Sequence, residues 1–258
     1  MLTRAPSGQL ARDLGYALDP VQLARQLGLE PDDWQARVLR SPSRQLILNC
    51  ARQVGKSTMT GVLAAHSALY EPGAPVLLLS PSLRQSGLLF AKVKAVLRGL
   101  GSDFADLVTD NALSVTLGNG SEIHSLPGKA GTVRGFSGVR TLIIDEAAYV
   151  ADELYRAVRP MLAVSGGQLV LLSSPFGRRG FFFEEWARGG ARWERVEVPY
   201  HRCPRIEPAF IEEERRALGL FFAQEYECAF LDTVNALFAG EDIDRAFDND
   251  VQPLFPIA

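Results

Sequence analysis

The chain has 258 residues, 47% of them hydrophobic, and can bury the core of one compact catalytic unit with a small appended subdomain. Its formal net charge of −3 argues against a protein that coats DNA by bulk electrostatic attraction, and its three scattered cysteines are too few for a disulfide framework or a zinc cluster. No segment approaches the ~20 apolar residues of a membrane span, and the N-terminus lacks the apolar core of a secretion signal. We therefore expect a cytoplasmic protein that has no membrane partner.

Predicted helices and buried strands alternate along the chain. In chain order they are helices over Pro20–Leu29 and Trp34–Leu39, a strand over Gln45–Cys50, a helix over Ser57–Leu69, a strand over Val76–Ser80, a helix over Ser82–Leu100, a hairpin pairing Ser114–Thr116 with Glu122–Ser125, a strand over Thr141–Glu146, a helix over Asp152–Leu162, a strand over Gln168–Ser174, an edge strand over Trp193–Val198, and helices over Pro208–Ala217 and Phe221–Phe230. This order predicts an α/β fold with a mainly parallel sheet covered on both faces, and ligands at the carboxyl ends of its strands. The last two helices indicate a small lid region.

The segment after the first strand, ARQVGKS, predicts a phosphate-binding loop. In the pattern G-x-x-x-x-G-K-[ST], loop amides and a helix N-terminus surround the β-phosphate of ATP. Lys56 would span the β and γ oxygens, and the Ser57 hydroxyl would hold Mg²⁺. Cys50 replaces the first glycine of the pattern, so an ordinary turn before a helix stays an alternative. The predicted nucleotide-binding residues of this segment are Cys50, Ala51, Arg52, Gln53, Val54, Gly55, Lys56, Ser57 and Thr58.

The predicted strand that begins at Thr141 ends in two adjacent carboxylates, Asp145 and Glu146. Asp145 would bind Mg²⁺ or its water shell, and Glu146 would polarise the water that attacks the γ-phosphate. Asp145 could instead only cap a following helix, but the upstream Gly-Lys-Ser favours the catalytic interpretation. A later apolar strand ends in Ser173 and Ser174, which could sense the γ-phosphate or simply terminate the strand.

In their order and spacing these motifs resemble the ATPase domain of the large terminase subunit, the motor that packages viral DNA. The resemblance is carried by PDDWQARVL at Pro31–Leu39, ARQVGKS at Ala51–Ser57, LIIDEAA at Leu142–Ala148, SSP at Ser173–Pro175, QEYECAFLD at Gln224–Asp232 and ALFAGEDI at Ala236–Ile243. It implies a P-loop NTPase of the ASCE type, with its core over residues 1–199 and a lid or linker subdomain over residues 200–258.

The resemblance also implies roles for single residues. Gln35 would read the adenine edge, while Trp34 would pack against the base or, as we favour, belong to the core. Arg52 matches the loop arginine that the family uses near the γ-phosphate. Arg134 matches the family's candidate arginine finger, which reaches the site of a neighbouring subunit, with Arg140 as its rival and a plain surface arginine as the alternative.

The implied activity is Mg²⁺-dependent ATP hydrolysis that drives double-stranded DNA into a procapsid in the cytoplasm of the infected host cell. The implied partners are the portal protein, the small terminase subunit and identical copies in a ring, expected to be a pentamer, with a monomer when free. The family's nuclease domain follows the motor, and we expect it to be absent from a chain that ends at Ala258. Two alternatives stay open. One is an SF2-like helicase or translocase ATPase, which needs a second motor domain, and the other is an ATP-switched module that docks on the portal.

Overall fold

The computed structural model describes residues 7–102, 105–128, 133 and 135–232 of the chain. Within these residues eight strands form one sheet in the order β3-β4-β5-β2-β6-β7-β1-β8. Their bounds are β1 Gln45–Cys50, β2 Pro75–Ser80, β3 Leu107–Asp110, β4 Ser114–Leu117, β5 Glu122–Pro127, β6 Thr141–Asp145, β7 Gln168–Ser173 and β8 Glu194–Val198. The five pairs from β5 to β8 in this order are parallel, and the β3–β4 and β4–β5 pairs are antiparallel. The predicted mainly parallel α/β fold is therefore confirmed.

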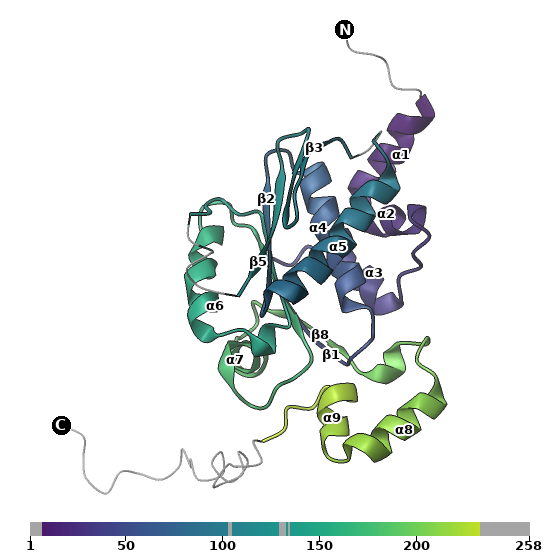
Figure 1. Cartoon of the computed structure of the whole chain (residues 1–258), viewed down its shortest axis with the longest axis vertical. Helices are drawn as coiled ribbons and strands as arrows, with labels where there is room; N and C mark the ends of the chain where they lie inside the picture. The colour runs from purple at the N-terminus through teal and green to yellow at the C-terminus, as the bar shows by residue number, and fades with distance from the viewer. Residues whose placement is uncertain (1–6, 103–104, 129–132, 134, 233–258) are drawn as a thin grey trace, which may run out of the picture.

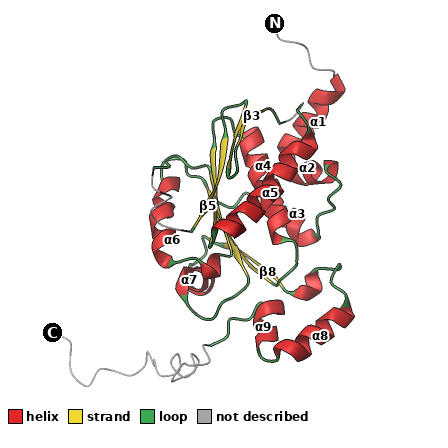
Figure 2. Cartoon of the chain, viewed as in Figure 1, coloured by secondary structure: helices red, strands yellow, loops and turns green. Residues whose placement is uncertain are grey.

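Helices cover both faces of this sheet (Figure 1). One face carries α1 Ser7–Leu18, α2 Pro20–Gln26, α3 Asp33–Leu39, α4 Lys56–Tyr70 and α5 Leu83–Leu100, and the other carries α6 Asp152–Val158 and α7 Gly180–Arg188. Short 3₁₀ helices occupy Ala147–Tyr149, Arg159–Leu162 and Tyr200–Arg202. Figure 2 shows α8 Pro208–Leu218 and α9 Phe221–Tyr226 beyond the end of the sheet at which β8 is labelled.

The central strands are apolar at nearly every position because both faces are buried. In β1, Leu46 and Leu48 pack into the core cluster beneath α1 to α5, whereas Ile47 between them packs into the cluster beneath α6 and α7. The same alternation holds in β2, β6 and β7. Successive side chains of each central strand thus enter two cores on opposite faces of the sheet, which explains why these strands have so few polar residues.

Three predicted helices end at least three residues earlier in the structure than the sequence predicts. The helix that starts at Pro20 ends at Gln26, because the N–H groups of Leu27, Gly28 and Leu29 turn back to the carbonyls of Ala24 and Arg25. The helix that starts at Phe221 ends at Tyr226, before Cys228 adopts a left-handed φ of 63°. The helix from Asp152 becomes a 3₁₀ turn at Arg159, beside a proline that has no N–H to donate.

None of the helices in the described residues has the length and apolar character that crossing a lipid bilayer requires.

Candidate nucleotide-binding site

The loop after β1 turns sharply before α4. Gln53 and Gly55 both adopt left-handed backbone conformations, with φ of 61° and 94°, and Gly55 is the N-cap of α4. For Gln53 this conformation costs roughly 1–2 kcal/mol, a strain typical of ligand-binding loops. The first N–H groups of α4 have no partner within the helix, so the turn presents them at the carboxyl edge of the sheet.

Two of the loop's amides are already bound by the protein. The Ala51 N–H donates to the Val198 carbonyl at 2.8 Å, and the Arg52 N–H donates to the Glu225 carbonyl at 2.9 Å. Cys50 is the last residue of β1, pairs with Val198 and is fully buried. These contacts hold the start of the loop against β8 and α9.

The strand order β6-β7-β1 brings the predicted catalytic groups together. The Lys56 ammonium group lies 3.2 Å from the Ala51 carbonyl oxygen and 4.0 Å from a Glu146 carboxylate oxygen, and its side chain is 8% exposed. The Ser173 hydroxyl at the end of β7 donates to the other Glu146 oxygen at 3.3 Å. Glu146 itself has a left-handed φ of 49°, which turns it away from the direction of β6.

Asp145 is buried at the end of β6, and its charge is poorly compensated. Burial raises the pKa of the Asp145 carboxyl to about 7, and the neighbouring Glu146 adds to the rise, while Lys56 and the Glu146 N–H, 3.1 Å away, oppose it. A cation bound beside Asp145 would offset this cost. Ser57 lines the adjoining cavity from the first turn of α4. A carboxylate and a hydroxyl are hard oxygen donors of the kind that Mg²⁺ takes, so these two residues fit such an ion.

A cavity of about 520 Å³ lies in front of these groups. It is lined by Arg52, Gln53, Val54, Gly55, Lys56, Ser57, Thr58, Gln85, Lys92, Glu146, Tyr149 and Ser174. Sequence analysis missed Gln85, Lys92 and Tyr149. The first two stand seven residues apart on α5 and therefore share a helix face, but nothing in the sequence shows that α5 borders the loop.

Arg52 is turned toward α9 in this structure. Its guanidinium donates to the Glu225 carboxylate, and its side chain is 58% exposed. The Tyr149 hydroxyl lies beside both Arg52 and Ser174, and its ring stacks on Phe176 with centroids 4.3 Å apart. Arg52 thus borders the cavity without pointing freely into it.

A second, more apolar pocket of about 270 Å³ adjoins the first at Gly55 and Thr58. Gln35 lines it together with apolar side chains that include Leu29, Leu39 and Met59. Its size suits one ring system rather than a whole drug-sized ligand. Trp34 is 5% exposed and packs in the core, which is the alternative that the sequence favoured.

Of the two candidate finger arginines, Arg134 and Arg140, the structure describes only Arg140. Arg134 and the segment Ala236–Ile243 fall outside the described residues. Arg140 directly precedes β6, at the amino ends of the parallel strands and hence at the opposite edge from Lys56. Its guanidinium binds the Glu71 carboxylate and donates to the Ser165 carbonyl at 3.2 Å. These contacts weaken the case for Arg140 as the finger.

Residues 47–245 match the family model described as "Terminase large subunit, T4likevirus-type, N-terminal". The large terminase subunits of Thermus phage G20c and Thermus virus P23-45 are each 25% identical to this chain, and the matched region covers 84% of this chain and 52% of each relative. The chain therefore spans about half the length of the curated relatives it matches.

Two solved structures share the fold. The ATPase domain of the Thermus phage P74-26 large terminase has a TM-score of 0.72 at 22% identity, covering 81% of this chain and 97% of that chain. The large terminase of a thermophilic bacteriophage, solved with ADP, has a TM-score of 0.62 at 15% identity, covering 78% of this chain and 54% of that chain.

Proposed function

The chain belongs to the terminase large subunit family and matches the model of its N-terminal region. We propose that it is the ATPase motor domain that drives double-stranded DNA into a viral procapsid. One observation carries the proposal. Lys56 at the start of α4, Glu146 after β6 and Ser173 from β7 converge beside a cavity that the N-terminus of α4 borders. An ammonium group and a helix N-terminus that bind phosphate, together with a carboxylate that positions water, are the groups that triphosphate cleavage requires.

Binding comes from the loop and from α4. The Lys56 ammonium group neutralises β and γ oxygens, and the free N–H groups at the start of α4 donate to phosphate. Ser57 and Asp145 would hold Mg²⁺, which when bound neutralises phosphate charge. The same ion would stabilise the ionised form of Asp145 against its burial.

Hydrolysis needs an oriented water molecule, and Glu146 would position it. The Ser173 hydroxyl bond holds one carboxylate oxygen, while the other faces Lys56. A carboxylate held from two sides can accept a proton from water as the oxygen attacks the γ-phosphate. This arrangement favours an enzyme over a nucleotide switch whose hydrolysis is incidental.

Further assignments complete the proposal. Gln35 reads the adenine edge, and Ser174 senses the γ-phosphate. Arg52 leaves Glu225 to reach the γ-phosphate, and Arg134 acts in trans as the arginine finger of a neighbouring subunit. Residues 1–199 form the ATPase core, and residues 200–258, which include α8 and α9, form a lid or linker. The chain assembles as a homo-oligomeric ring with the portal protein and the small terminase subunit in the cytoplasm of the infected host cell.

The test separates ATP binding from cleavage. Glu146→Gln should bind ATP with nearly parental affinity but cleave it ~10²-fold or more slowly in single-turnover assays, the scale of general acid–base catalysis. Lys56→Ala should bind ATP poorly. Glu153→Gln, an exposed acid on α6, is the matched control and should leave both properties unchanged. Cleavage by Glu146→Gln at the parental rate would show that the acidic assignment is wrong.

A further inference from the structure

The apolar pocket beside the loop is bordered by a residue from the segment between β8 and α8. The Arg205 guanidinium lines this pocket and donates two hydrogen bonds to Asp32, from Nη1 to Oδ1 and from Nη2 to Oδ2, both at 2.7 Å. Two parallel hydrogen bonds fix the orientation of the carboxylate relative to the guanidinium as well as the distance between them. The Asp32 side chain is 10% exposed, so the pair is partly shielded from water.

Asp32, which the ion pair holds in place, also contacts Gln35. Asp32 is the N-cap of α3, and its backbone N–H donates to the Gln35 Oε1 atom at 2.9 Å in a capping box. The other end of the carboxamide lies against the loop, because a Cβ atom placed on Gly55 would be 2.7 Å from Gln35 Nε2. Arg205, Asp32 and Gln35 therefore form a continuous chain of polar contacts that ends at the pocket.

The direction of a carboxamide decides which purine it fits. The outer edge of adenine presents the N7 acceptor and the N6 amino donor, whereas guanine presents two acceptors, N7 and O6. When the amide oxygen and nitrogen are both fixed, the oxygen can accept from the adenine N6 amino group while the nitrogen donates to N7. Against guanine, the same oxygen would face the O6 acceptor and could not form a hydrogen bond with it. The Asp32 N–H, which can bond only to the oxygen, fixes this direction for Gln35.

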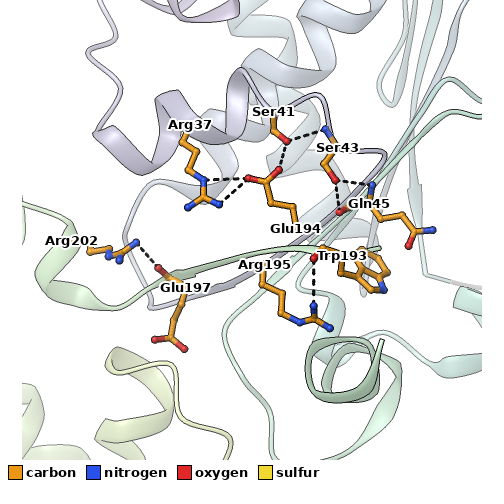
Figure 3. A network of polar contacts seen from close by, with 9 residues as sticks. All are labelled: Arg37, Ser41, Ser43, Gln45, Trp193, Glu194, Arg195, Glu197 and Arg202. Carbon is orange, nitrogen blue, oxygen red and sulfur yellow. Dashed lines mark hydrogen bonds and ion pairs between the residues drawn. The ribbon is translucent and has the colours of Figure 1, made fainter. Parts of the chain in front are cut away.

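The far end of α3 is held independently. Arg37 donates to Glu194 of β8 from Nε at 3.2 Å and from Nη2 at 3.0 Å, and the Ser41 hydroxyl binds the same carboxylate (Figure 3). Removing Arg205 should therefore release the first turn of α3 and leave the helix docked on the edge strand.

We propose that Arg205 is a positioning residue for base recognition, which sets the Gln35 carboxamide through Asp32 and thereby the preference for adenine over guanine. This inference rests on the proposed function as an ATPase. It adds a residue from outside the nucleotide-binding motifs and gives it a role in base specificity.

The experiment measures equilibrium affinities of the whole chain for ATP, GTP and inorganic tripolyphosphate by calorimetry. Arg205→Ala should lower the ATP-over-GTP affinity ratio about tenfold, equivalent to ~1.4 kcal/mol, while tripolyphosphate affinity stays unchanged. Asp32→Asn, which removes the ion pair but keeps a capping side chain, should lower the ratio as well, and Arg205→Lys should fall between Arg205→Ala and the parent. Arg216→Ala, an exposed arginine on α8, is the matched control.

The outcomes separate this inference from the proposed function. A parental chain that binds none of the three ligands would overturn both. A parental chain that binds ATP but does not prefer it over GTP, or an unchanged ratio in both Arg205→Ala and Asp32→Asn, would overturn only the inference. Equal weakening of tripolyphosphate and ATP would also overturn it, because Arg205 would then act on phosphate.

Discussion

Two features of Gly55 disfavour any side chain at this position, and Gly55→Ala tests both. Its φ of 94° is left-handed, and a Cβ atom there would lie 2.7 Å from Gln35 Nε2. Gly55→Ala should cost ~1–2 kcal/mol in backbone strain and ~1 kcal/mol more as Gln35 is displaced from its capping bond, a total of ~2–3 kcal/mol. The free energy of unfolding from urea titration measures this cost.

Gly73 offers the matched control. Its φ of 71° is also left-handed, but nothing lies within 4 Å of a Cβ atom placed on it. Gly73→Ala should therefore show the strain alone, and the difference between the two variants isolates the contact with Gln35. Equal losses in the two variants would mean that Gln35 is not held against the loop. Gly55→Ala should in addition weaken ATP binding, and Gly73→Ala should not.

Two further predictions concern histidine titration and the loop arginine. Burial lowers the pKa of His66 below its ordinary 6.5, so the unfolded chain binds more protons than the folded chain between the folded pKa and 6.5, and stability should fall as the pH drops through that window. His66→Gln should lack this component, and a constant stability difference between parent and variant in urea titrations at about pH 7.5 and about pH 5.5 would contradict it. Glu225→Gln removes the ion pair between Glu225 and Arg52. If Arg52 contacts phosphate as proposed, ATP affinity should rise up to about fivefold, because a partly exposed pair contributes at most ~1 kcal/mol. That increase should vanish in the Arg52→Ala background, and its persistence there would show that Arg52 is not involved.

The sheet was predictable because its central strands are short, apolar and bounded by proline or polar residues. The helix α1 was not predicted, although Leu10, Leu14 and Leu18 recur at helical spacing. These leucines are 63%, 57% and 77% exposed, so this stripe is not the face that packs. The strand β3 is too short, and in large part too exposed, to leave a pattern. The left-handed residue Cys228, which follows α9, has a conformation that its residue type does not indicate.

The site residues that stand in a sequence motif directly after a strand were predictable. The residues that reach the site only because two helices pack together were not. Lys56 and Glu146 belong to contiguous motifs next to apolar runs. Lys92 reaches the cavity because α4 and α5 approach closely at Gly61, where a Cβ atom would lie 3.2 Å from the Lys92 backbone. That approach depends on the missing side chain of Gly61, which lies on α4 outside both motifs.

The departure of this chain from the usual loop pattern has a structural explanation. Cys50 stands where the pattern has its first glycine, yet among the described residues the left-handed positions of this loop are Gln53 and Gly55. Because Cys50 still pairs with Val198 as the last residue of β1, and the Ala51 N–H extends this contact, the turn begins after the position that glycine would occupy. A side chain is therefore tolerated at position 50, buried in the core, and the loop turns between Gln53 and the start of α4.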